Sequence, residues 1–189
     1  GVVPVALDVT QPAQIEAAVR ACGDVTLLVN NAGISRGSSF LGSPDAVAAA
    51  RAEFETNFFG PWALTQAFAP VLASNGGGAV LNVLSALAWT TFPGVATYSA
   101  TKSAAWSLSN GLRNELAGQG TQVTSLHVAL MDTDMAARLP GPKTSPDDAA
   151  RQALAGVEAG LPEVLADEVT RQLKQSLSTE RPAYASPPA

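Results

Sequence analysis

The chain has 189 residues, 47% of them hydrophobic, with a formal net charge of −5, which fits one globular domain with a sizeable core. The acidic balance and the lack of a basic run argue against nucleic-acid binding and attachment to anionic membranes. The single cysteine, Cys22, excludes an intrachain disulfide and a cysteine-rich zinc site. Because we find no run of roughly 18 apolar residues and no signal peptide, we expect a cytoplasmic protein without a membrane span.

Short apolar runs alternate with helical patterns along the chain. The expected elements, in order, are a strand at 2–7, a helix from about 12, a strand at 25–29, a helical pattern at 44–74, a strand at 79–84, a helix ending near 116, a strand at 122–128, a helix at 147–159, a short strand at 163–166 and a helix to about 177. We expect Thr10 to cap the first helix, and Gly60 and Pro61 to kink or divide the long one.

This alternation predicts βαβ units, and hence a doubly wound parallel sheet in three α/β/α layers. We expect residues 1–177 to form one domain, and the proline-rich tail 178–189 to be disordered or to lie across a surface. Ligands of such sheets bind at the carboxyl ends of the strands. The segments that follow predicted strands are Asp8, Asn30 to Gly33, Ser85 and 128–133.

The pair Tyr98 and Lys102 stands out within a predicted helix. Residues four apart lie on one helix face, roughly 5–6 Å apart at their Cβ atoms. A free tyrosine has a pKa near 10, and a neighbouring cation favours the phenolate and lowers that pKa. The pair therefore suits proton transfer near neutral pH. On its own, it is also compatible with an ordinary pair on a helix surface.

Five pieces of sequence occur in a recognisable order: Asn30-Asn31-Ala32-Gly33 after a strand, Asn57 in a helix, Ser85 after the next strand, Tyr98-x-x-x-Lys102, and Asp132-Thr133-Asp134-Met135 after the following strand. In these residues the chain resembles a short-chain dehydrogenase/reductase of the classical type. The resemblance covers nearly the whole chain and implies a Rossmann-like fold, incomplete at its N-terminal side.

The resemblance implies an NAD(P)-dependent oxidoreductase that interconverts a carbonyl and an alcohol. Tyr98 would exchange a proton with the substrate oxygen, and Ser85 would hydrogen-bond the same oxygen. Lys102 would hold the nicotinamide ribose and lower the pKa of Tyr98. Asn57 would help to hold a water that connects Lys102 to solvent.

The same resemblance implies contacts with NAD or NADP, without a choice between the two. Besides Tyr98 and Lys102, the implied cofactor-binding residues are Asp8, Val9, Asn30, Ala32, Gly33, Met131 and Thr133. No metal site is expected, because the chain has a single histidine and scattered carboxylates.

Two departures from the family pattern stand out. Val128-Ala129 occupies the place of a usual Pro-Gly, which is acceptable if the backbone φ there is negative. The family's Gly-rich turn is absent before Asn30. In strand order 3-2-1-4-5-6 the strand at 2–7 would then have no neighbour to bond. We therefore hypothesise roughly 50–60 further N-terminal residues, the content of two βα units.

Other residues receive plainer interpretations. His127 lies in a strand pattern away from the matching positions, so we interpret it as a packing residue, which also disfavours a hydrolase built on Ser85. Residues 134–146 are expected to form a substrate lid. Small and apolar side chains near the serine suggest a small to medium, partly apolar substrate: Ala86, Leu87, Trp89, Phe92 and Val95.

The helix that carries Tyr98 is lined with small residues and with Trp106, Leu108 and Leu112. In the family this helix and the long one before it pair across a two-fold axis, which implies a homodimer or homotetramer. The alternative to an enzyme is a non-catalytic relative that works as a binding or scaffold protein. Only the absent Gly-rich turn supports it, and the retention of the catalytic set argues against it.

Overall fold

The computed structural model describes residues 1–185 and contains one parallel sheet. Its strands follow the order β1-β2-β3-β4, with bounds β1 (Leu27–Asn30), β2 (Ala79–Val83), β3 (Gln122–His127) and β4 (Glu163–Leu165). Each coincides with an apolar run predicted to be a strand. All four runs are short, and the two central ones, β2 and β3, are mostly buried, as expected for strands covered on both faces.

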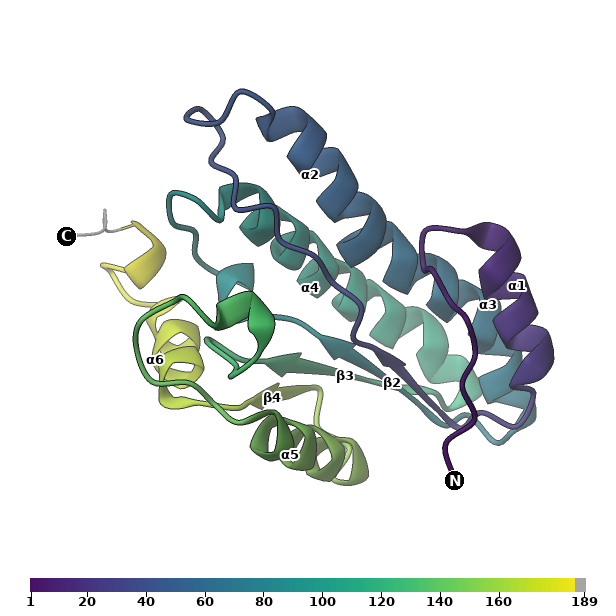
Figure 1. Cartoon of the computed structure of the whole chain (residues 1–189). Helices are drawn as coiled ribbons and strands as arrows, with labels where there is room; N and C mark the ends of the chain where they lie inside the picture. Colours follow the sequence, from purple (N-terminus) through teal and green to yellow (C-terminus); the bar gives the residue numbers. More distant parts are fainter. Residues whose placement is uncertain (186–189) are drawn as a thin grey trace.

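Six α-helices of the described residues surround the sheet: α1 (Pro12–Ala21), α2 (Ala46–Phe54), α3 (Gly60–Ser74), α4 (Ala96–Leu116), α5 (Pro146–Glu158) and α6 (Glu168–Ser176). Helices α1, α3 and α4 cover one face of the sheet, and α5 packs on the other (Figure 1). The predicted doubly wound α/β fold is thereby confirmed.

The predicted strand at 2–7 is wrong. These residues form no strand, and their valines are exposed, with Val2 at 97% and Val3 at 81%. Among the described residues no strand lies beside this segment, so its backbone has no ladder to join. The predicted cap is also wrong, because Gln11 is the N-cap residue of α1 and Thr10 instead donates its N–H and hydroxyl to Asp8.

The long helical pattern is divided near Gly60, as predicted. The element that divides it is a π-helical turn at Glu55–Phe59, directly before α3 begins at Gly60. Such turns are frequent at functional sites, because the extra residue changes the direction in which a side chain points. A Cβ at Gly60 would lie 2.6 Å from Val9 Cγ2, which is closer than carbon atoms can approach. Only glycine therefore lets the chain before α1 pack against this junction.

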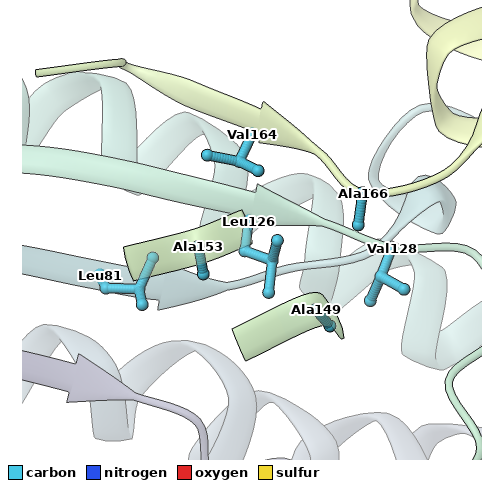
Figure 2. Close-up of a cluster of buried hydrophobic side chains, with 7 residues drawn as sticks. All are labelled: Leu81, Leu126, Val128, Ala149, Ala153, Val164 and Ala166. Atoms are coloured by element: carbon cyan, nitrogen blue, oxygen red, sulfur yellow. The ribbon is translucent and has the colours of Figure 1, made fainter. Parts of the chain in front are cut away.

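The side of the sheet that faces α5 is held by a compact apolar cluster (Figure 2). Leu81, Leu126 and Val164 come from three adjacent strands. Ala149 and Ala153 of α5 face them, and their small side chains let the helix approach closely. This cluster holds β4 and β3 in register beneath the loops that follow the strands.

Over residues 178–185 the chain turns back toward α6. Ala183–Ala185 form a single 3₁₀ turn, and Ala183 donates its N–H to Ser176 Oγ at 3.2 Å. The remainder of the expected tail, residues 186–189, lies outside the described residues. None of the helices seen between residues 1 and 185 has both the length and the apolar character required to cross a bilayer.

Candidate active site

Tyr98 and Lys102 lie on one face of α4, as their spacing predicted. The Lys102 ammonium nitrogen is 5.5 Å from the centroid of the Tyr98 ring. Lys102 is only 5% exposed, and its Nζ donates to the carbonyl oxygen of Val83 at 2.8 Å. Since Val83 ends β2, this bond attaches α4 to the carboxyl end of a central strand.

Asn57 is held in the π-helical turn by three hydrogen bonds. Its Oδ1 accepts from the Ile34 N–H at 2.8 Å, and its Nδ2 donates to the Ile34 carbonyl at 2.9 Å and to Thr101 Oγ1 at 3.0 Å. The side chain is buried. Asn57 therefore joins the loop after β1 to α4, one residue before Lys102.

At Gly33 the loop after β1 packs closely against the side chains of Asn57 and Lys102. A Cβ on Gly33 would lie 3.5 Å from Asn57 Oδ1 and 3.8 Å from Lys102 Nζ. A small, largely enclosed cavity lies beside these atoms, and Asn30, Ala32, Asn57, Asn82 and Lys102 are among the residues that line it. The structure thus brings together Ala32, Gly33, Asn57, Tyr98 and Lys102 from three separate stretches of sequence.

Ser85 directly follows Leu84 at the end of β2 and is buried. Its Oγ accepts the N–H of Leu87 at 3.1 Å. A hydroxyl has one hydrogen and two acceptor lone pairs, so this bond leaves the Ser85 hydrogen free for donation elsewhere. The following turn is tied to α4 through Ser103, whose Oγ donates to the Ala88 carbonyl at 2.9 Å.

The expected lowering of the Tyr98 pKa is not seen. Burial, reinforced by the Glu53 carboxylate, raises the pKa of Tyr98 to about 12. Burial also lowers the pKa of Lys102 to about 8. The loss of water around the buried phenol disfavours the phenolate, and so does the nearby negative charge of Glu53. Tyr98 is a protonated phenol at neutral pH.

Glu53 is a residue of this site that the sequence analysis missed. It is fully buried in α2, and its Oε1 accepts the Arg36 N–H at 2.6 Å. Its Oε2 is buried with no hydrogen-bond partner among the described residues. Glu53 and Asn57 are four residues apart in a continuous helical run, a spacing that could have revealed it.

Replacing Glu53 with glutamine is expected to lower the pKa of Tyr98, because it removes a negative charge that opposes the phenolate. The Tyr98 phenolate should then appear at lower pH in an ultraviolet titration. The titration curve of Tyr98→Phe contains only the signal of the second tyrosine, Tyr184, and is subtracted. The exposed Glu55 on the same helical run provides the matched control, Glu55→Gln. An unchanged titration in Glu53→Gln would show that this charge does not act on Tyr98.

The other residues implied to bind a cofactor are more dispersed. Asp8 is exposed, and Thr10 holds its carboxylate and lowers its pKa. Val9 is buried against α3. Asn30 is buried, and its Nδ2 donates to Thr65 Oγ1 and Asn82 Oδ1. Met131 pairs with Thr144 in an isolated bridge.

The segment after β3 adopts an ordinary backbone despite lacking Pro-Gly. Among the described residues no non-glycine residue has a positive φ, so Val128 and Ala129 are unstrained. The Ala129 N–H donates to Asp167 Oδ2 at 2.7 Å. Asp167 also caps α6, so its carboxylate fixes the start of the loop that carries Met131 and the exposed Thr133.

The suggested apolar pocket wall is partly wrong. Trp89 is buried, because its ring stacks on His127 with centroids 4.1 Å apart. Phe92 is 45% exposed and remains available. Two of the apolar residues expected to add area to the helix that pairs between subunits, Trp106 and Leu112, make contacts within the chain: Trp106 donates to Glu163, and Leu112 lies in the core.

Solved structures of short-chain dehydrogenases and reductases share this fold. A short chain dehydrogenase from Burkholderia cenocepacia, in complex with NADP, is 40% identical with a TM-score of 0.89, over 94% of this chain and 74% of that one. The 3-ketoacyl-(acyl-carrier-protein) reductase from Brucella melitensis, complexed with NADH, is 28% identical with a TM-score of 0.76, over 85% and 74% of the two chains.

Comparison with curated sequences finds oxidoreductases. The NADP-dependent 3-hydroxy acid dehydrogenase of Schizosaccharomyces pombe is 28% identical over 179 residues, which span 90% of this chain and 68% of that protein. An uncharacterized oxidoreductase of Bacillus subtilis is 38% identical over 114 residues, or 59% of this chain and 40% of that protein. The chain thus spans less than half of the second relative. Residues 1–143 match the family model of the short chain dehydrogenases, and the chain belongs to that family.

Proposed function

We propose that this chain carries the catalytic site of an NAD(P)-dependent oxidoreductase that interconverts a carbonyl and an alcohol on a small to medium, partly apolar substrate. The observation that carries the proposal is the convergence of Asn57, Tyr98 and Lys102 beside Gly33, at the carboxyl end of β2 where Ser85 begins the next turn. That is the edge at which ligands of parallel sheets bind.

The protonation states support specific roles. With a pKa of about 12, the Tyr98 phenol holds its proton at neutral pH and can give it to a carbonyl oxygen during reduction. The Ser85 hydroxyl has its hydrogen free, so it can donate to the same oxygen. Two donors directed at an oxygen that gains negative charge stabilise the transition state.

The donor set around Lys102 fits a nicotinamide cofactor. An ammonium has three donor hydrogens, and the described contacts use one of them, on Val83. The others suit ribose hydroxyls, while Asp8, Val9, Asn30, Ala32, Gly33, Met131 and Thr133 would contact the rest of NAD or NADP. The cofactor, when bound, supplies or accepts the hydride. The chain's own residues bind it and handle the proton.

We propose that residues 1–177 form one catalytic domain, followed by a tail at 178–189. We also propose a cytoplasmic location, which the single cysteine supports. Purified full-length protein should oxidise NADH or NADPH in the presence of some members of a panel of aldehydes and ketones. If no member is reduced and neither cofactor changes its fluorescence on titration, the non-catalytic scaffold is the better account.

We also propose a homodimer or homotetramer assembled through α2, α3 and α4. Phe59 and Trp62 support it: their rings stack at 6.4 Å, and each is 44% exposed although aromatic. Clustered exposed aromatic side chains on a helix mark contact surfaces.

Trp62→Glu is expected to shift the assembly toward monomer in light scattering at micromolar concentration, because a buried carboxylate without a partner is costly. Ala17→Glu, which adds the same charge at an exposed position of α1, should leave the assembly intact. Wild-type protein that is already monomeric would contradict the proposed interface.

A further inference from the structure

His127 is buried directly behind the proposed catalytic serine. It ends β3, is 0% exposed, and its Nδ1 lies 3.2 Å from the carbonyl oxygen of Ser85. A carbonyl oxygen only accepts, so Nδ1 carries a hydrogen and donates it. The ring therefore contacts the serine backbone, whereas the serine hydroxyl interacts with Leu87.

The other ring nitrogen faces a carboxylate. His127 Nε2 is 3.6 Å from Oε1 of Glu163 in β4 and has no hydrogen-bond partner among the described residues. At that distance the attraction is mainly electrostatic. Glu163 also accepts from Lys174 Nζ at 2.6 Å and from Trp106 Nε1 at 2.8 Å.

These contacts keep Glu163 ionised. The neighbouring His127 contributes most to lowering the pKa of Glu163 to about 2, Lys174 and Trp106 add to it, and burial opposes them. The carboxylate therefore places a fixed negative charge 3.6 Å from the Nε2 edge of the ring, opposite the Nδ1 edge that faces Ser85.

Two indole rings hold both His127 and Lys174 in place beside Glu163. Trp89 stacks on the His127 ring at an interplanar angle of 20°. Lys174 Nζ lies 4.9 Å from the centroid of the Trp89 ring and 5.1 Å from that of the Trp106 ring. Indole faces attract cations, so these rings stabilise the Lys174 ammonium together with the Glu163 carboxylate. Glu163, and Lys174 beyond it, are the charged groups of the described residues that face His127.

We propose that His127 is a positioning residue for Ser85: held between the Ser85 carbonyl and the Glu163 carboxylate, its ring fixes the segment that carries the serine hydroxyl. The Leu84 N–H donates to the Leu126 carbonyl oxygen in β3, and the Ala86 N–H donates to that of Val128, directly after β3. These bonds fix the residues on either side, so the ring supplies the contact at Ser85 itself. The positioning role rests on the oxidoreductase function proposed above, whereas the donor pattern of the ring does not.

Nuclear magnetic resonance of ¹⁵N-histidine in the full-length protein tests the donor pattern. His127 is the only histidine of these 189 residues, and His127→Gln assigns its signals. Nδ1 should carry hydrogen in the wild type, because it donates to the Ser85 carbonyl oxygen. A wild-type ring whose Nδ1 carries no hydrogen overturns the proposal whatever the variants do.

Kinetics test the positioning. In His127→Gln the amide can donate to Ser85, but its oxygen meets the Glu163 carboxylate. We expect kcat to fall roughly 10–100-fold, since a displacement near 1 Å can cost about 10², while KM for cofactor and substrate stays within about twofold. Adding Glu163→Gln supplies an amide donor to the new oxygen and should restore part of kcat.

Glu168→Gln, the same change at an exposed position of α6, is the matched control, and circular dichroism checks folding. An unchanged kcat in His127→Gln, or no recovery in the double variant, overturns the positioning role. If the wild type turns over no carbonyl compound, the proposed function fails, and the resonance result still decides how the ring is protonated.

Discussion

Replacing Tyr98 with phenylalanine is expected to lower kcat for carbonyl reduction by roughly 10²–10⁴-fold, the usual contribution of a positioned acid. The variant loses one hydroxyl and keeps the ring that packs in α4. Because the hydroxyl sits in a buried setting that keeps it protonated, with a pKa of about 12, we propose that it delivers that proton to the carbonyl oxygen.

Folding and cofactor affinity should be nearly unaffected in Tyr98→Phe, which circular dichroism and fluorescence titration with NADH or NADPH can check. The second tyrosine offers a matched control: Tyr184 lies in the turn after α6 and is 54% exposed, so Tyr184→Phe should leave turnover unchanged. A Tyr98→Phe variant with wild-type turnover would remove this residue from the mechanism.

Replacing Lys102 with methionine is expected to abolish measurable turnover and, at the same time, to stabilise the fold. Burial lowers the pKa of Lys102 from 10.5 to about 8. A shift of that size corresponds to about 3 kcal/mol of cost for the buried ammonium at neutral pH. The Val83 carbonyl loses a hydrogen bond in the variant, which removes about 1 kcal/mol of the gain. The net expectation is about 2 kcal/mol.

The sign of the pH dependence follows from linkage. Between about pH 8 and pH 10.5 the unfolded chain keeps the Lys102 proton that the folded chain has released, so wild-type stability rises with pH there. The stability advantage of Lys102→Met in urea unfolding should therefore be largest near neutral pH and should shrink toward pH 10.5. An advantage that is constant with pH, or a less stable variant, would contradict the buried charge.

Local sequence patterns correctly predicted the strands that have a neighbouring strand among the described residues. The runs at 79–84 and 122–128 became adjacent strands because each has a neighbour on both sides. The equally apolar run at 2–7 did not, since a strand needs a ladder and no described strand lies beside it. Apolar character alone therefore overpredicted the sheet at this end.

At the site, the four-residue spacing of Tyr98 and Lys102 correctly predicted that the two side chains are close. It did not predict the direction in which the pKa of Tyr98 is shifted. It placed Tyr98 over Lys102 correctly because both lie on one helix. The direction of the tyrosine pKa depends on burial and on Glu53 in another helix, neither of which the local pattern contains. Likewise His127 was correctly expected to be buried, but its contacts with Ser85 and Glu163 arise from neighbouring strands and could not be read from β3 alone.

We propose that these residues serve hydride transfer between a nicotinamide cofactor and a carbonyl carbon. The most direct test of this role uses NADH and NADPH that carry deuterium at the ring carbon that donates hydride, with a reducible ketone and the full-length protein. We predict an alcohol with one deuterium on the former carbonyl carbon, formed by wild type and Tyr184→Phe and almost absent with Tyr98→Phe. Alcohol without deuterium, or equal deuterium transfer by Tyr98→Phe, would contradict it.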